Sequence, residues 1–569
     1  MKWRALLQNQ WFQLCLLVAL LSGGTTIYNT VKLKPPAPSG VASRTPSPTP
    51  VNKIRPKKPG QWILDASGAR DSDSKDIQVV AASLTEGDVV TIRPGTYTGS
   101  CEIAVSARFV GPASGTGVAT IRSVEPKRAG MSISGKRVSL ENLSINLDIE
   151  GDAAVIRIVG SSQVGMKGCS ISTQAKFGVY VHENASLTAE DSQFRASGVG
   201  CCLKYEGNSQ GSLSHCTFSG GQWGFEATKA ALVEASNCSF QKLGLANGHG
   251  NTVAATGGSA SVKLDTCQFT DNTATIFADQ GATLTIIGST FQNNGVTDET
   301  GNINNGLVSV KNKAKAVLEN DTFDNNKQGL IAMKAGSMNL THVAMNHTGL
   351  AVVKNGALRP FSPSISANEQ DTIVVATDCT IEDSRACGIA VAAGAHFKMD
   401  GGSVRQAVDC WLYLGGTGGA ATAEFDNVQF TAATKNGLFV GTGSSLTLQR
   451  CQISDAQVGL YVRDQGTEAL VSNTTIKGCK GAGMVAQLEG TISAGGCTIE
   501  ENARGIQVGD SKDDPANNAA VALTDCTVRG NSIFGLGAWQ RGTIKMRGGF
   551  LGNNTKNSEQ SSGGEIHVD

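Results

Sequence analysis

The chain alternates apolar and polar residues over many short segments. Two examples are ASLTAEDSQF (185–194) and SSLTLQRCQI (444–453), and each ends on an aromatic or β-branched residue. A second kind of segment places apolar residues directly after a glycine, as in FGVYV (177–181) and NGLFV (436–440). Segments this short with a period of two predict β-strands that bury one face, because a helix would need a longer run with a period of 3.6.

The segments recur with a nearly fixed period of about 22 to 26 residues, interrupted by a few insertions. A fixed period indicates a solenoid, in which a coil buries its apolar face only by stacking on its neighbours. At about 4.8 Å per coil, the repeats predict a rod of about 16–18 coils and roughly 75 to 80 Å. The residues that end the first kind of segment, here called anchors, are Ile145, Ile171, Phe194, Phe218, Phe240, Phe269, Phe291, Phe323, Val343, Ile381, Val404, Phe430, Ile453, Ile476, Ile499, Val528 and Phe550.

Asparagine recurs three positions after an anchor, where its amide suits a tight bend and can hydrogen-bond from coil to coil. These asparagines are Asn272, Asn294, Asn326, Asn502, Asn531 and Asn553. The order of anchor, asparagine and glycine-led apolar run resembles the parallel β-helix repeats of the pectin-lyase-like superfamily. Residues 76–99 are similar to the first coil of that superfamily, in which a short helix caps the open end and Gly95, Thr96 and Tyr97 close the first strand.

The resemblance covers about residues 61–569 and implies an all-β fold, a right-handed parallel β-helix. It implies much less about the reaction, since the superfamily includes polysaccharide lyases, hydrolases, epimerases and non-enzymatic surface proteins. The function has to be sought in particular residues on the surface of the predicted rod.

The first 60 residues differ from the repeats. Lys2 and Arg4 precede a short apolar run, so residues 1–30 are expected to be a signal peptide or a signal anchor, and the sequence leaves both open. Residues 31–60 are rich in proline, serine and basic residues, which is typical of an extended linker before the β-helix at 61–569. We therefore expect an extracytoplasmic protein, either membrane-anchored or secreted to the periplasm or the cell surface.

The composition of the chain limits the classes of binding partner that we expect. The 48 basic residues balance 48 acidic ones, so the sequence predicts no nucleic-acid partner. Eight of the 15 cysteines lie two positions before an anchor, and strand alternation predicts that they point inward as small buried hydrophobes. We expect no metal and no cofactor. The eight are Cys169, Cys216, Cys238, Cys267, Cys379, Cys451, Cys497 and Cys526.

One catalytic candidate stands out, His249 in the sequence Gly248–His249–Gly250. The three residues resemble the G-H-G element of the polygalacturonase branch. That branch also has paired aspartates on the preceding coils and a later R-I-K, and this chain has neither. Since inverting hydrolysis needs a general acid and a general base on either side of the bond, His249 lacks the necessary partners and no catalytic residue is predicted.

The glycine-led strands offer a better candidate, for binding. Their second residue after glycine should face outward. With Cys410 counted as the glycine equivalent in the first coil, this puts Tyr413, Phe439 and Tyr461 on three successive coils, and alternation adds Trp411 and Arg463 to the same face. Aromatic residues make up only 5% of the chain, so an exposed stripe of them is unusual. Such rings can stack on sugar rings. The alternative is a cross-coil ladder that only stabilises the rod.

Two insertions, near 354–370 and 510–518, are expected after glycine-led strands and on the same edge of the rod, as walls of a groove for an extended polymer. We therefore expect a non-catalytic carbohydrate-binding or surface structural module. Its expected partner is a polysaccharide or cell-surface glycan, with membrane contact through the N-terminal segment if that segment is not cleaved. The alternative is a polysaccharide lyase or glycoside hydrolase that acts on an acidic polysaccharide.

Overall fold

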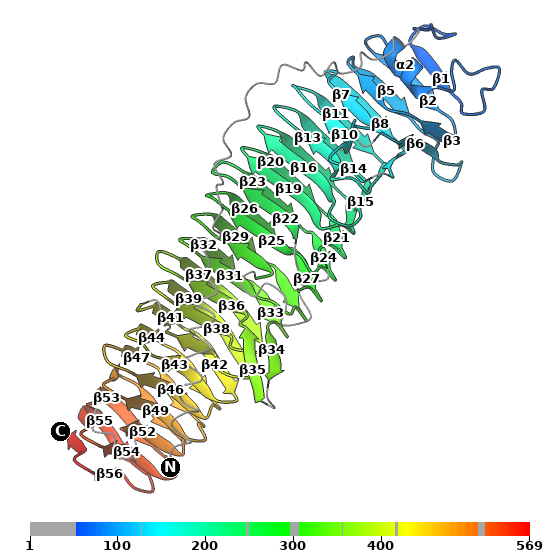
Figure 1. Cartoon of the computed structure of the whole chain (residues 1–569). Helices are drawn as coiled ribbons and strands as arrows, with labels where there is room; N and C mark the ends of the chain where they lie inside the picture. The colour runs from blue at the N-terminus through cyan, green and yellow to red at the C-terminus, as the bar shows by residue number, and fades with distance from the viewer. Residues whose placement is uncertain are drawn as a thin grey trace.

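The chain forms a long rod of stacked coils (Figure 1). The structure, a computed structural model, describes residues 53–125, 127–148, 150–245, 250–295, 306–354, 357–415, 419–509 and 518–569, with the backbone alone at 351–354 and 357–361. Strands of successive coils pair in parallel, from β1 (Gln61–Leu64) beside β2 (Asp88–Ile92) to β55 (Thr543–Gly552) beside β57 (Glu565–Val568). The predicted all-β, right-handed parallel β-helix is confirmed, with about 19 turns in the described residues.

Each coil contributes strands to two sheets, here called sheet A and sheet B. In a representative coil, β25 (Thr275–Asp279) belongs to sheet B, while β26 (Thr283–Ile287) and β27 (Thr290–Gln292) belong to sheet A. Gly288, with φ of 59°, turns the chain between the two sheet A strands, and a bend at Asn293 and Asn294 returns it to sheet B.

Within the described residues, sheet A holds 36 strands and sheet B holds 19. The strands of sheet B, which carry the candidate surface, are β4 (Cys101–Ile103), β7 (Met131–Ile133), β10 (Ala154–Ile158), β13 (Phe177–Val181), β16 (Cys201–Gly207), β19 (Trp223–Lys229), β22 (Asn251–Thr256), β25, β28 (Val308–Val310), β31 (Leu330–Met333), β36 (Ile365–Asn368), β38 (Ile389–Ala392), β40 (Leu412–Leu414), β43 (Asn436–Val440), β46 (Val458–Arg463), β49 (Ala482–Gln487), β52 (Arg504–Val508), β54 (Phe534–Trp539) and β56 (Ser558–Ser561).

Inward side chains form continuous columns because residues one period apart are paired in register. Six anchors make a stack of phenylalanine rings whose consecutive centroids lie 4.3 to 5.2 Å apart. Burying each such ring stabilises the fold by about 1.5 to 3 kcal/mol, and ring stacking adds about 0.5 to 1.5 kcal/mol. The six are Phe194, Phe218, Phe240, Phe269, Phe291 and Phe323, and all are at most 1% exposed.

The predicted asparagine ladder is confirmed in the middle of the rod. The amide oxygen of Asn294 accepts hydrogen bonds from the backbone and side-chain nitrogens of Asn272, and Asn326 does the same for Asn294. A second ladder joins Asn502 to Asn531 in the same way. These amides satisfy backbone groups that the turns would otherwise leave buried without partners.

The second ladder continues to Asn554, so the assignment of Asn553 is wrong. The cause is a misplaced anchor. Val528 pairs with Leu551, while Phe550 faces outward and is 47% exposed. Because Leu551 is the true anchor, the third residue after it is Asn554, whose amide oxygen accepts from Asn531.

Val343 is a second misplaced anchor. The residue that pairs with both Phe323 and Ile381 is Met345, so Val343 lies two positions before the anchor, where other coils have cysteine. All eight repeat-position cysteines are at most 1% exposed, which confirms that they are buried in the core.

A short helix lies at the N-terminal end of the rod, as the superfamily resemblance implied (Figure 1). Asp76 caps helix α2 (Ile77–Ser83) by accepting from the Gln78 and Val79 amides, and the helix buries Ile77 and Val80. Of the expected linker, residues 53–60 are described, while the expected signal peptide or anchor at 1–30 lies outside the described residues. Within the described residues, no helix is long and apolar enough to cross a membrane.

Candidate functional site

Three aromatic side chains lie in line on the outer face of sheet B. Tyr413 of β40 pairs in register with Phe439 of β43, and Phe439 pairs with Tyr461 of β46. All three side chains are partly exposed, in contrast to the fully buried rings of the core. The predicted order and outward direction of these three residues are confirmed, and we call them the aromatic stripe.

The rings of the stripe touch one another. The centroids of Tyr413 and Phe439 are 5.1 Å apart with nearly parallel planes, and Phe439 and Tyr461 are 5.7 Å apart with planes at 60°. No sugar ring fits between two rings at these separations. A ligand on this face would therefore lie against the outer surface of the stripe and not between its rings.

Trp411 does not belong to the stripe, and its expected outward position is wrong. It is 0% exposed, packs 5.7 Å from Phe430, and donates through Nε1 to the Thr431 carbonyl. Leu412 pairs with Leu438, so Trp411 occupies the position that glycine holds in the next coil, Gly437. The chain bends there, and simple alternation counted back from Tyr413 fails.

The position of the Trp411 indole explains why the next coil has glycine at residue 437. A Cβ on Gly437 would lie 2.1 Å from the Trp411 ring, so glycine is required directly above the indole. At this position the core is therefore filled by the large side chain of Trp411 in one coil, and Gly437 leaves room for it in the next coil.

Polar groups border the aromatic stripe next to Tyr461. The Tyr461 hydroxyl donates to the amide oxygen of Gln487 at 2.5 Å. Arg463 lies on the same face, as predicted, where its Nε is 3.1 Å from an Asp464 carboxylate oxygen and its side chain is 37% exposed. Gly441 leaves room for the Phe439 ring, which would be 3.2 Å from a Cβ at that position. Aromatic edges and hydrogen-bonding groups therefore meet at one place.

The predicted groove walls are not as expected. The first insertion forms the antiparallel hairpin of β34 (Leu350–Lys354) and β35 (Ala357–Ser362), which precedes the sheet B strand β36 (Figure 1). It therefore lies on the opposite edge of sheet B from any loop that follows a sheet B strand. The glycine-led run at 349–353 belongs to this hairpin and was mistaken for the sheet B strand. Most of the second insertion, 510–517, lies outside the described residues.

The N-terminal part of the same face carries a charged cluster that the sequence did not reveal. Tyr180, Lys204 and Glu226 are successive outward residues, and Lys204 Nζ lies 2.6 Å from a Glu226 carboxylate oxygen. Glu206 accepts from the Tyr180 hydroxyl and lies 2.6 Å from Lys229 Nζ. The partners in each pair are about 22 to 26 positions apart in the chain, so no short sequence motif contains both of them.

In the charged cluster, each lysine is paired with a glutamate, and these contacts shift the pKa values of Glu206 and Tyr180. Lys229 and then Tyr180 lower the pKa of Glu206, while burial and the bond to Glu206 raise the pKa of Tyr180. The Tyr180 hydroxyl therefore keeps its proton, which it donates in a hydrogen bond to Glu206.

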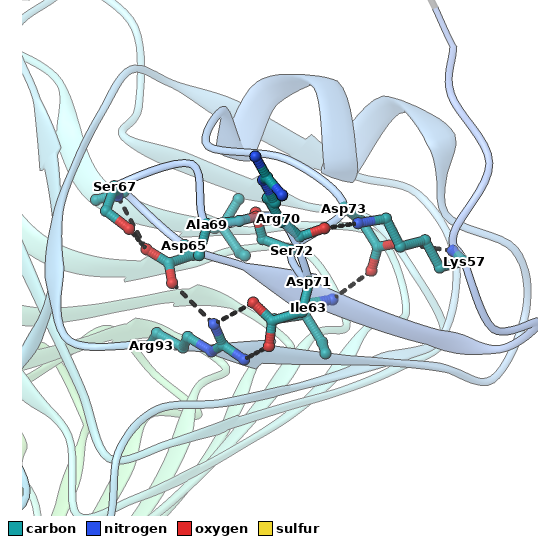
Figure 2. Close-up of polar contacts among 12 residues, drawn as sticks. Lys57, Ile63, Asp65, Ser67, Ala69, Arg70, Asp71, Ser72, Asp73 and Arg93 are labelled. Carbon is teal, nitrogen blue, oxygen red and sulfur yellow. Dashed lines mark hydrogen bonds and ion pairs between the residues drawn. The ribbon is translucent and has the colours of Figure 1, made fainter.

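A third polar cluster lies at the N-terminal end, where Arg93 bridges Asp65 and Asp71 (Figure 2). Arg93 Nη1 is 3.0 Å from Asp65 and 2.9 Å from Asp71, and Asp73 accepts from the Lys57 and Ile63 amides. Hydrogen bonds from Ser67 and Arg93 lower the pKa of Asp65. The guanidinium supplies the positive charge at this point, so the cluster is a brace for the first coil.

Sheet A has a shallow hollow of about 520 Å³ near the same end. Its floor includes Gly165, whose missing side chain leaves open space between Ser139 and Thr188, and Arg108 and Arg137 lie at its side. This hollow is the principal alternative to the aromatic stripe as a binding surface.

Two further candidates concern chemistry. His249 lies outside the described residues, so its surroundings stay a prediction. Among the described residues, the group whose ligand atoms are close enough to hold a metal consists of Cys387, Asp409 and Cys410, with atoms within 4.8 Å of one another. No sequence pattern predicts this group, because neither cysteine occupies the repeat position.

Comparison with known families matches this architecture. The model described as "right handed beta helix region" matches overlapping stretches at 113–240, 195–344, 234–422 and 363–557, which together span most of the chain. The chain belongs to the right-handed β-helix family. A comparison with curated protein sequences finds no match.

Solved structures of the same fold class are distant. An alginate lyase from Paenibacillus sp. str. FPU-7 is 13% identical over 56% of this chain and 93% of its own, with a TM-score of 0.31. A mannuronic acid specific family 6 polysaccharide lyase from human gut microbiota is 15% identical over 68% of this chain and 86% of its own, with a TM-score of 0.29. Tailspike protein 3 of bacteriophage CBA120 is 11% identical over 84% of this chain and 63% of its own, with a TM-score of 0.26.

Proposed function

We propose that this β-helix is a non-catalytic carbohydrate-binding module that holds an extended polysaccharide along the outer face of sheet B. The observation that carries the proposal is the aromatic stripe of Tyr413, Phe439 and Tyr461, exposed in register on three coils. The stacked phenylalanine rings of the core are fully buried, whereas these three rings are partly exposed side by side on successive coils, which calls for a reason.

The geometry suits a linear ligand. Successive strands lie about 4.8 Å apart, so the stripe and its polar border extend along the rod axis. Ring edges and faces offer apolar contact, and Arg463 with Gln487 offers hydrogen bonds at one end. A rigid β-sheet holds these groups in place, which lowers the entropy cost of binding.

The test is retention of the full chain on a panel of immobilised extended glycans. We expect the Tyr413→Ala/Tyr461→Ala double variant to bind its glycan about tenfold more weakly, which corresponds to about 1.4 kcal/mol. Phe550→Ala is the matched control, because it removes a ring that is 47% exposed on sheet A. Both variants should remain folded at the assay temperature, although the double variant loses the ring contacts of the stripe and the Tyr461 hydrogen bond to Gln487. Equal retention of double variant and parent on every glycan would reject the proposal.

We further propose an extracytoplasmic location, on the basis of the expected signal peptide or anchor at 1–30 and the proline-rich segment at 31–60. A rod that displays a binding face is then held away from the membrane or released from it. Fractionation of cells that express the tagged chain tests this. Recovery of the full-length chain in the cytoplasm would contradict it.

The charged cluster supports a second candidate, a lyase or hydrolase that acts on an acidic polysaccharide. Lys204 and Lys229 could attract uronate groups, and the Tyr180 hydroxyl, which donates to Glu206, lies beside them where it could hydrogen-bond a sugar oxygen. Uronic-acid polymers incubated with the chain would then yield unsaturated products or new reducing ends. Any such activity should disappear in Tyr180→Phe and persist in the Tyr413→Ala/Tyr461→Ala variant, whereas no product from any polymer would exclude this candidate.

A further inference from the structure

Two cysteines outside the repeat position lie next to each other on adjacent coils. Ile389 of β38 pairs with Leu412 of β40, so Cys387 and Cys410, each two residues earlier, occupy the same level of neighbouring coils. The backbone amides of Gly388 and Ile389 donate to the carbonyls of Cys410 and Trp411, which fixes this register. Neighbouring strands are about 4.8 Å apart, within the range of Cα separations that a disulfide requires.

The two sulfur atoms are in direct contact. Cys387 Sγ lies 2.7 Å from Cys410 Sγ and 3.6 Å from an Asp409 carboxylate oxygen. The other oxygen of Asp409 is 2.6 Å from Lys435 Nζ. Asp409 can therefore accept a thiol proton while Lys435 balances its charge.

The sulfur separation distinguishes a disulfide from a metal site. Two thiolates bound tetrahedrally to zinc at about 2.3 Å would be roughly 3.7 Å apart, whereas a disulfide bond is about 2.05 Å long. The observed 2.7 Å lies closer to the disulfide, and it needs only a small movement of two side chains. A metal would have to push the two sulfur atoms apart against a paired backbone.

We propose that Cys387 and Cys410 are a site of oxidative modification, at which a disulfide links two coils beside the aromatic stripe. The oxidant is a small-molecule or protein disulfide. Cys387 passes its proton to Asp409 and its sulfur attacks one sulfur of the oxidant, which releases one thiolate and leaves a mixed disulfide. Asp409 returns that proton to the released thiolate. Cys410 Sγ then attacks Cys387 Sγ, and the second thiolate leaves and takes up the Cys410 proton. Two thiols are oxidised and one external disulfide is reduced to two thiols.

Accessibility sets this pair apart from the other cysteines. Cys387 is 8% exposed, more than any other of the described cysteines, and the eight repeat-position cysteines are at most 1% exposed. Of the described cysteines, Cys387 is therefore the one that an external disulfide meets first. The bond would close one whole coil between residues 387 and 410 and hold Tyr413 in its register.

The experiment incubates the folded full chain with oxidised glutathione, blocks free thiols after denaturation, and maps tryptic peptides by mass spectrometry. Cleavage isolates Cys387 in peptide 386–398 and Cys410 in peptide 406–435, each with a single cysteine. We expect these two peptides to be joined before any other pair and to separate on reduction. The oxidised chain should unfold at a higher temperature than the reduced chain.

Three variants complete the test. Cys387→Ser and Cys410→Ser should each abolish both the joined peptide and the thermal shift, while Cys451→Ser, a repeat-position control, should keep both. Recovery of both peptides unlinked after oxidation would overturn the proposal. So would cadmium binding by the reduced parent chain that both variants lose and that blocks oxidation of the pair, since this result would assign a metal site.

Discussion

The asparagine ladder makes the sharpest prediction about stability. Asn294 is fully buried, its amide oxygen accepts from two nitrogens of Asn272, and its side-chain nitrogen donates to the Phe269 carbonyl at 2.9 Å. Asn294→Ala would leave the Asn272 backbone amide and the Phe269 carbonyl without these partners, while the Asn272 side-chain nitrogen would keep its bond to the Phe240 carbonyl. Each such group costs about 1 to 3 kcal/mol, so for the two groups together we expect the free energy of unfolding to fall by about 4 kcal/mol.

The matched control is Asn339→Ala, which removes an exposed asparagine from the outer face of β32 (Ser337–Thr341). This change should cost less than about 0.5 kcal/mol. Urea unfolding followed by circular dichroism gives the two differences. Because each coil contacts only its neighbours, hydrogen exchange should quicken mainly in the coils beside Asn294. A loss in Asn294→Ala no larger than that of the control would refute the reasoning.

Two other substitutions follow from packing and burial. Gly437→Ala should lower the unfolding temperature strongly because its Cβ would strike the Trp411 ring, whereas Gly495→Ala meets no atom within 4 Å and should not; equal temperatures would contradict the packing. Burial raises the pKa of Asp321 from 3.8 to about 7, because the folded protein favours the protonated carboxyl. The contribution of Asp321 to the free energy of unfolding is therefore largest at low pH and is lost as the pH rises through about 7. That loss is up to about 4 kcal/mol, and Asp321→Ser, which copies Ser289 of the preceding coil, should remove much of it between pH 5 and 8 in urea unfolding. A parallel pH profile in both chains would show that Asp321 is not the cause.

Much of the fold can be predicted from the sequence because the same residue pattern occurs in many coils. The inward face is predicted correctly by the alternation in each segment and by the cysteine that recurs before the anchor. The repeated asparagines correctly predict the ladder of hydrogen-bonded amides. Where the choice rested on residue type in a single coil, it failed. The aromatic side chain of Phe550 predicts an anchor, although pairing with Val528 puts Leu551 inside.

The site was only partly predictable. Counting outward from glycine found Phe439 and Tyr461, since those strands are regular, and Tyr413 was included by taking Cys410 as the glycine equivalent, whereas Trp411 holds that position. Trp411 was missed because the chain bends at the glycine position, and alternation does not cross a bend. The charged cluster and the cysteine pair depend on contacts between coils, which depend on the exact register and leave no local pattern.

The location of a bound ligand tests the proposed function most directly. A crystal of the full chain grown with an extended oligosaccharide from a glycan that retains it should show the sugar over β40, β43 and β46, in contact with Tyr461 and Arg463. A sugar bound instead in the sheet A hollow beside Gly165, with the aromatic stripe free, would contradict the account.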